Sequence, residues 1–297
     1  MSIDRFRDRT GAAGIVFNEK LWVIGGEEDL EWKSDVWCSP DGEDWTEVTE
    51  AAPFSPRYNH KVYILNEKLW VVGGSDETFN TLTDVWFSSD GSNWAEVSIE
   101  GRKNTSALSL SFSFKNKLWL AFGAGRELWS TLDGVSWHLE TDQYEHPHGA
   151  REIVECNGKL IMFTRDSEVN RIWYSEDAIR WSVTELQTQE FIEGDDVNVL
   201  LHGDEVWVFT YNPIDERALL WTTKDGKNWS KKTGSIYFGQ VDMNDAYLVV
   251  FDKNLYVVGG NREIRTEKAE KWSKRKDLNW VETAPDGFFS DFKMVSG

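Results

Sequence analysis

The chain has 297 residues and a formal net charge of −19, from 32 Lys and Arg against 51 Asp and Glu. This charge repels phosphate backbones and anionic lipids, so it disfavours nucleic acids and membrane surfaces as partners. Hydrophobic residues make up 40% and charged residues 28%, which is ordinary for a globular protein with a sizeable core. The 17 Trp residues are more than a single site could use, and they indicate an internal repeat.

In chain order, each unit begins with two apolar strands joined by a short polar turn. The first strand of a unit reads AAGIVF at 12–17, HKVYIL at 60–65 and AYLVVF at 246–251. The turn reads NEK, NGK or DKN, and the second strand begins at Leu21, Leu69, Leu118, Leu160, Val206 and Leu255. Runs of this length and β propensity predict strands rather than helices.

A pair of Trp residues, eight positions apart, follows these strands in every unit. The pairs are Trp37 and Trp45, Trp86 and Trp94, Trp129 and Trp137, Trp173 and Trp181, Trp221 and Trp229, and Trp272 and Trp280. The spacing from one pair to the next is typical of propeller blades. We expect these rings to pack between neighbouring blades, because a lone four-stranded sheet exposes two apolar faces.

Between the paired Trp lies a turn motif, a Ser or Thr followed two residues later by Asp and then, in four units, by Gly. The Asp residues are Asp41, Asp90, Asp133, Asp177 and Asp225, and only the sixth unit, 272–280, lacks the pattern. Asp can accept hydrogen bonds from nearby amides and Gly supplies a positive φ, so each motif predicts a hairpin turn. The third and fourth strands of a unit flank this turn.

These elements predict an all-β fold, a single β-propeller of six four-stranded antiparallel blades, with seven blades less favoured because the chain is too short. The expected blades are 9–53, 54–101, 102–143, 144–188, 189–236 and 237–286. Residues 287–297 add one more strand, which either pairs with an exposed edge as a clasp or belongs to an incomplete seventh blade. Cys38 and Cys156 are expected to be buried thiols in different blades.

The repeat resembles kelch repeats, such as those in the central domain of galactose oxidase. The resemblance is carried by the double Gly after the second strand (Gly25-Gly26, Gly73-Gly74 and Gly259-Gly260) and by the Trp pair, although the fourth and fifth units lack the double Gly. The SxDGxxW turn is similar to the Asp-box of sialidases. The resemblance implies that ligands or partner peptides meet the face formed by the loops entering the first strand and leaving the second.

That face carries Arg residues in several loops, and a ring of guanidinium groups there would attract carboxylates. The alternative is that each Arg pairs with a neighbouring acid. The predicted binding residues are Trp32, Arg57, Tyr58, Asn59, His60, Arg126, His146, His148, Arg151, Arg165, Tyr211, Asn261 and Arg262. Trp32, expected in a loop outside the repeat, is a candidate for sugar stacking, for anchoring a protein, or for capping the fold.

No residues form a recognisable catalytic set, and neither a phosphate-binding loop nor a dinucleotide fingerprint occurs. His146 and His148 lack a third ligand at zinc spacing, so no metal or cofactor is expected. The first hypothesis is a non-enzymatic scaffold that binds a protein or peptide. The second is a carbohydrate-active protein: an acidic-sugar glycosidase, a sugar epimerase-like enzyme or a lectin. The N-terminus lacks a signal-peptide pattern, which predicts a cytoplasmic location unless a leader has been removed.

Overall fold

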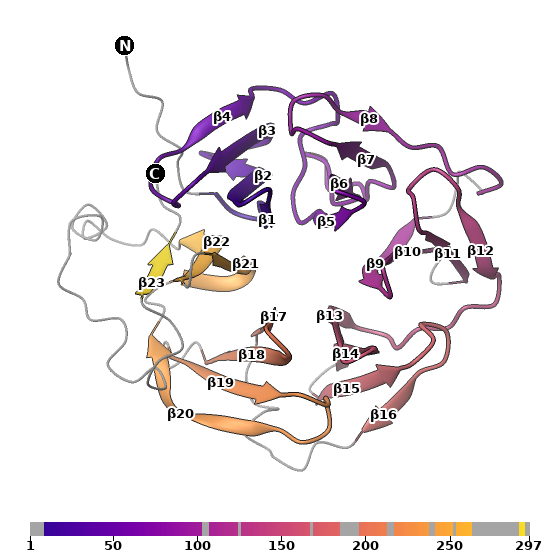
Figure 1. The fold of residues 1–297 in the computed structure, drawn as a ribbon, viewed down its shortest axis with the longest axis vertical. Coiled ribbons are helices and arrows are strands. Elements are labelled where there is room, and N and C mark those ends of the chain that lie inside the picture. The colour runs from indigo at the N-terminus through magenta and orange to yellow at the C-terminus, as the bar shows by residue number, and fades with distance from the viewer. Residues whose placement is uncertain are drawn as a thin grey trace.

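Sheets of the protein are arranged in a ring around a central axis (Figure 1). The computed structural model describes residues 9–102, 107–123, 126–166, 169–184, 196–212, 217–237, 241–251, 254–262 and 291–294. Every named element in these ranges is a β-strand. The fold is an all-β propeller, as predicted from the repeat.

Five of the sheets are four-stranded and antiparallel, with strands in chain order from the axis outward (Figure 1). Blade 1 has β1 (Ala13–Phe17), β2 (Lys20–Glu28), β3 (Glu31–Ser39) and β4 (Thr46–Thr49); blade 2 has β5 (Lys61–Leu65), β6 (Lys68–Val72), β7 (Val85–Ser88) and β8 (Ala95–Glu96); blade 3 has β9 (Leu108–Phe114), β10 (Lys117–Phe122), β11 (Glu127–Thr131) and β12 (His138–Thr141). Blade 4 has β13 (Ala150–Cys156), β14 (Lys159–Asp166), β15 (Val169–Ser175) and β16 (Ser182–Thr184); blade 5 has β17 (Asp196–His202), β18 (Glu205–Asn212), β19 (Arg217–Thr223) and β20 (Ser230–Tyr237).

The prediction of six four-stranded antiparallel blades is wrong, because the part of the chain that the structure describes forms five of them. The remaining sheet has three strands among the described residues: β21 (Val241–Phe251), β22 (Asn254–Arg262) and β23 (Asp291–Met294). β23 runs parallel to β22, with Asn254 opposite Asp291 and Val257 opposite Met294. The C-terminal strand therefore occupies the edge where the third strand of a meander was expected, and Trp272 and Trp280 lie outside the described residues.

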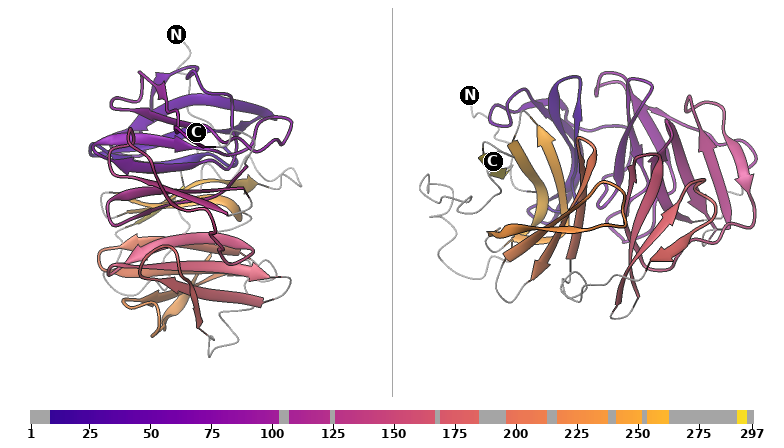
Figure 2. Two further views of the ribbon diagram at one scale, coloured as in Figure 1. Left: turned by 90° about the vertical axis from the view of Figure 1, so that its right-hand side faces the viewer. Right: turned by 60° about the horizontal axis from the view of Figure 1, so that its bottom comes forward.

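This three-stranded sheet lies between blade 5 and blade 1, where β21 contacts both β17 and β1. Neighbouring sheets around the ring pack face to face, as Figure 2 shows in side view. Because each sheet is covered on both sides, the ring buries the apolar faces that an isolated sheet would expose.

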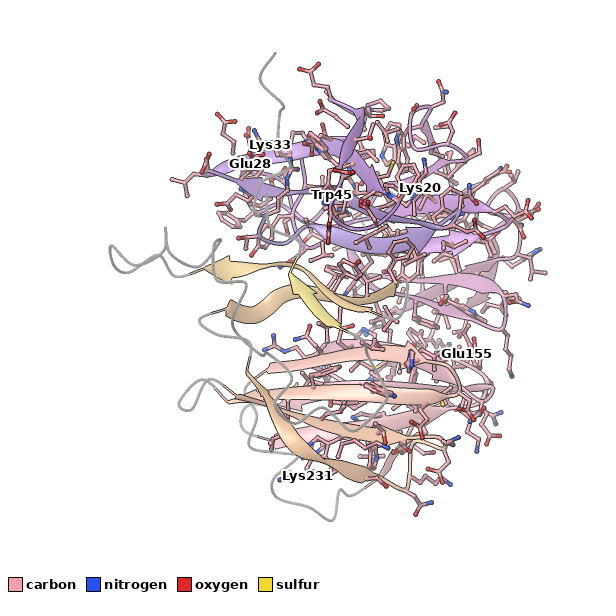
Figure 3. All side chains as sticks on the ribbon, turned by 60° about the vertical axis from the view of Figure 1, so that its left-hand side comes forward. Lys20, Glu28, Lys33, Trp45, Glu155 and Lys231 are labelled. Atoms are coloured by element: carbon pink, nitrogen blue, oxygen red, sulfur yellow. The ribbon has the colours of Figure 1, made fainter. Side chains whose placement is uncertain are left out.

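Both Trp residues of the pair pack against the preceding sheet in four of the four-stranded blades, and one of the two does so in blade 4, which confirms the expected use of these rings. Trp86 and Trp94 of blade 2 join a cluster with Ile24 and Val36 of blade 1. The pairs at three further seams are Trp129 with Trp137 against blade 2, Trp221 with Trp229 against blade 4, and Trp37 with Trp45 against the three-stranded sheet. At the seam between blades 3 and 4, Trp181 alone joins the cluster of blade 3. Trp45 is labelled on blade 1 in Figure 3. Burying one such ring stabilises the fold by a few kcal/mol.

The turn between the Trp residues has the hydrogen bonds that its sequence predicts. In blade 2, Ser88 Oγ accepts the Gly91 amide at 2.8 Å, and Asp90 Oδ1 accepts the amides of Ser92 and Asn93, each at 2.8 Å. The same bonds recur at Asp41, Asp133 and Asp225. Each Asp is a turn residue that fixes local backbone.

The Gly of this turn has a second function, close approach to the preceding sheet. A Cβ on Gly134 would lie 1.8 Å from Trp70, and a Cβ on Gly91 would lie 2.2 Å from Trp22. Blade 4 carries Ala178 at this position, with a φ of 67° and no exposed surface. The turn glycines therefore form part of the contact between blades.

Candidate functional site

The two faces of the ring differ in construction. The Asp turns and the short β1–β2 type turns lie on one face, and the longer loops lie on the other, which we call the loop face. In blade 1, Glu28 and Lys33 lie at the loop-face end and Lys20 at the opposite end (Figure 3). The predicted binding residues were all expected on the loop face.

Arg57 is buried rather than available at the channel mouth, by which we mean the opening of the central axis of the ring on the loop face. Its side chain has no exposed surface, and its guanidinium donates to Asp84 at 3.0 and 2.7 Å and to the Gly73 carbonyl at 2.9 Å. Asp84 also accepts the indole N–H of Trp86 at 2.7 Å. The expectation that Arg57 binds a ligand is therefore corrected: its charge is balanced inside the protein.

Blade 1 contains the same device, which the sequence interpretation missed. Arg9 forms hydrogen bonds with Asp35 and with the Gly25 carbonyl, and Asp35 accepts the indole N–H of Trp37 at 2.8 Å. The sequence contains evidence for this similarity, because Arg9 and Arg57 each precede the first strand of their blade by four positions. A paired Arg, Asp and Trp at matching places in two units indicates a structural role.

His60 is also buried, with no exposed surface. Neither ring nitrogen has a hydrogen-bond partner among the described residues. The ring lies near Gly25, whose Cβ would be 3.0 Å from His60 Cε1. His60 therefore packs between blades 1 and 2, and its predicted role as an exposed binding residue is corrected.

The burial of His60 makes stability depend on pH. Desolvation, together with the charges of Arg57 and Lys61, holds the pKa of His60 well below its ordinary value of 6.5. Below about pH 6.5, His60 is protonated in the unfolded chain but stays neutral in the folded protein. The contribution of neutral His60 to the free energy of unfolding is therefore fully present above about pH 6.5 and is lost as the pH falls below it. We expect the free energy of unfolding to fall by up to about 1.4 kcal/mol per pH unit from pH 6.5 to 5.

Denaturant unfolding at a series of pH values measures this slope. His60→Gln should flatten it, because glutamine does not titrate, whereas His148→Gln, at an exposed position, should leave it in place. An equally steep slope in the His60→Gln protein would show that another group is responsible.

Trp32, Tyr58 and Phe79 form an aromatic patch on the loop face, brought together from three separate segments. The Trp32 and Tyr58 ring centroids are 5.2 Å apart, and Phe79 meets Trp32 edge-on at 5.5 Å. Trp32 lies on β3 in a long hairpin, which corrects its expected place in a loop. Leu30, at the tip of this hairpin, is 89% exposed. Sequence order gave no reason to group Phe79 with the two predicted residues.

Phe79 is held outward by a loop built around one carboxylate. Asp76 Oδ1 accepts the amides of Thr78 at 2.9 Å and Asn80 at 3.0 Å, and the Phe79 amide donates to the Asp76 carbonyl at 2.8 Å. The Thr78 hydroxyl and these amides lower the pKa of Asp76 to about 2, so the carboxylate remains ionised. Phe79 itself has a φ of 60° and is 78% exposed. Exposing a large apolar ring on a sterically costly backbone calls for a functional explanation.

A cavity of about 400 Å³ lies beside the aromatic patch, at the channel mouth. It is lined by residues of β5, β9, β13 and β21, together with Asn59 and Ser75. Tyr58 and Ser75 exchange backbone hydrogen bonds, which places the edge of the patch next to the cavity. Asn59, a predicted binding residue, is exposed and lines this cavity.

The other predicted residues are dispersed over the loop face. Arg126, Arg151 and His148 are exposed, and Arg151 lines the cavity. His146 is half-buried, and its Nδ1 lies 2.9 Å from the Pro147 carbonyl oxygen. Four others lie on strands instead of in the loops expected for them, and their side chains are outside the described part of the structure: Arg165 on β14, Tyr211 on β18, and Asn261 and Arg262 on β22.

In the described ranges, no three His, Cys, Asp or Glu side chains lie close enough together to hold a metal ion. The same part of the chain contains no helix with the length and hydropathy of a membrane span. Cys38 and Cys156 are both free and buried, in blades 1 and 4, as predicted.

Part of the chain matches a known protein family. Residues 65–176, from the end of β5 to just beyond β15, match the family model described as the DUF6242 beta propeller domain. No curated protein matches the chain. The match and the ring of sheets agree on a β-propeller, and the description of the family records a fold without an activity.

Proposed function

We propose that this propeller is a non-enzymatic binding protein that recognises a protein or peptide through its loop face. The observation that carries the proposal is Phe79, an exposed ring fixed outward by the Asp76 loop and supported by Trp32. Rigid aromatic side chains are common energetic centres of protein interfaces, because they bury much area and lose little conformational entropy. Because the scaffold already holds such a ring in one position, less conformational entropy is lost when a partner binds.

The shape of the patch favours a protein or peptide over a glycan. Phe79 and Leu30 project from tight turns with 78% and 89% of their surface exposed, so they are suited to enter a partner's apolar pocket. A sugar would instead require an open ring face, but Trp32 already contacts Tyr58 and Phe79. A carbohydrate-binding role therefore ranks second.

We also assign the repeat to the kelch type with Asp-box turns. The double Gly at 25–26 and 73–74, with positive φ at all four residues, supports the first assignment. The Ser/Thr and Asp hydrogen bonds within the turns support the second. Both assignments concern the local structure of the repeat. They do not identify a ligand, which depends on the side chains of the loop face.

Selection of peptides from a random library on the purified protein tests the proposed function. Peptides that bind through the aromatic patch should lose at least about tenfold in affinity to the Phe79→Ala protein, the loss typical of an interface hot spot. Val135→Ala is the matched control, because Val135 is 73% exposed but lies on the opposite face. Isothermal titration calorimetry measures both variants.

Two results would count against the proposal. One is equal affinity of selected peptides for the wild-type and Phe79→Ala proteins. The other is a failure to select any peptide combined with a glycan-array signal that Trp32→Ala abolishes, which would favour the carbohydrate hypothesis.

A further inference from the structure

The cavity at the channel mouth has a composition that the aromatic patch does not explain. Its volume, about 400 Å³, is within the range of small-molecule sites. Leu82, Leu108 and Ile153 provide apolar wall, while charged and hydroxyl groups come from the strands nearest the axis. Such a mixture of apolar wall and a few converging polar groups is typical of sites for small organic ligands.

Charges within the cavity do not cancel. Lys61 Nζ lies 3.2 Å from a carboxylate oxygen of Glu152 and 5.0 Å from the centre of the Tyr247 ring. Burial alone lowers the pKa of Lys61, but Glu152 and the nearby tyrosines outweigh it and the net shift is upward, so the ammonium persists. Arg151 also lines the cavity, and it has no ion-pair partner among the described residues. One positive charge therefore remains after Lys61 and Glu152 neutralise each other.

Neutral hydrogen-bond groups line the same cavity. The Tyr63 hydroxyl and Ser111 Oγ are 2.9 Å apart, across the gap between blades 2 and 3. Burial raises the pKa of Tyr63, so the hydroxyl keeps its proton and can donate. Asn59 adds an amide at the rim of the cavity. A guanidinium accompanied by neutral donors suits an anion with two acceptor oxygens.

We propose that the cavity is a binding site for a small organic monocarboxylate, with the carboxylate at Arg151 and an apolar body against the Leu82, Leu108 and Ile153 wall. A single charge matches the one uncompensated cation. Phosphate, which carries more charge at neutral pH, matches less well. The site goes beyond the proposed function, because it depends on Arg151 rather than on Phe79.

Phenylacetate and its neutral analogue phenylacetamide test the proposal on the full chain by isothermal titration calorimetry. They have nearly the same size and shape, so a difference between them reports the carboxylate. We expect saturable binding of phenylacetate and at least tenfold weaker binding of phenylacetamide. Arg151→Gln should weaken phenylacetate at least tenfold, whereas Arg180→Gln, at an exposed position in the turn on the opposite face, should leave it unchanged.

Three outcomes would overturn the proposal: no saturable phenylacetate binding at millimolar concentration, equal binding of acid and amide, or unchanged binding in the Arg151→Gln protein. The comparison of acid and amide needs only wild-type protein, so it remains decisive even if Arg151→Gln folds poorly. Peptide binding that is lost in Phe79→Ala would be unaffected by any of these outcomes, so the two proposals can fail separately.

Discussion

Replacing Asp84 with alanine is expected to lower the free energy of unfolding by about 3–5 kcal/mol, the usual effect of removing one partner of a buried ion pair. The change leaves the fully buried Arg57 guanidinium without its carboxylate and removes the acceptor of the Trp86 indole. Both losses occur where blades 1 and 2 meet. Urea unfolding followed by Trp fluorescence measures the effect.

Asp204→Ala is the control, because it removes a fully exposed ion pair with Lys224 and should leave stability nearly unchanged. The double variant Arg57→Met with Asp84→Leu should recover much of the loss, because apolar residues of similar volume can replace a buried pair at little cost. Asp84→Ala with the stability of Asp204→Ala would show that the pair is not needed.

Gly134→Ala is expected to destabilise the protein by about 2–5 kcal/mol, from a strained left-handed backbone and an overlap with Trp70. The φ of Gly134 is 75°, and the added Cβ would lie 1.8 Å from the Trp70 ring, which is itself 1% exposed. The ring cannot move without disturbing the seam between blades 2 and 3. Chemical denaturation of the variant measures the loss.

Gly158→Ala separates the two contributions to this loss. Gly158 has a φ of 74°, but no atom lies within 4 Å of the Cβ that alanine would add. Gly158→Ala should therefore lose only the stability that a left-handed backbone conformation costs, about 1–2 kcal/mol of the free energy of unfolding. If both variants lose the same stability, the contact between turn and ring contributes nothing.

Most of the propeller was predictable because its stabilising contacts repeat. The Trp spacing, the turn residues and the apolar strands each recur in several units, so one correct interpretation applied to many segments. The three-stranded sheet was not predictable by this route. Segment 272–280 lacks the Ser/Thr, Asp and Gly of the turn, and the parallel pairing of β23 with β22 joins distant segments that carry no shared motif.

The candidate site was predicted less well, for a physical reason. A sequence indicates that Arg57 and His60 precede a strand, but it does not indicate that both side chains turn inward, since that depends on Asp84 and on the space beside Gly25. Trp32 and Tyr58 were chosen separately and are neighbours in the structure. Phe79 was overlooked because its exposure depends on the hydrogen bonds of the Asp76 loop.

Two contacts near the axis join sheets that are not neighbours. Lys61 of blade 2 reaches Glu152 of blade 4, and the Tyr247 hydroxyl of the three-stranded sheet donates to the His60 carbonyl of blade 2. A propeller opens first where the contacts between its blades are weakest. The two contacts lie at the loop-face rim of the ring, so they keep the blades together there while the blades separate at the opposite rim, which carries the Asp turns. Thermal breathing should therefore start at the Asp-turn rim, and the rim that carries Phe79 and Arg151 should hold its shape between encounters with ligands.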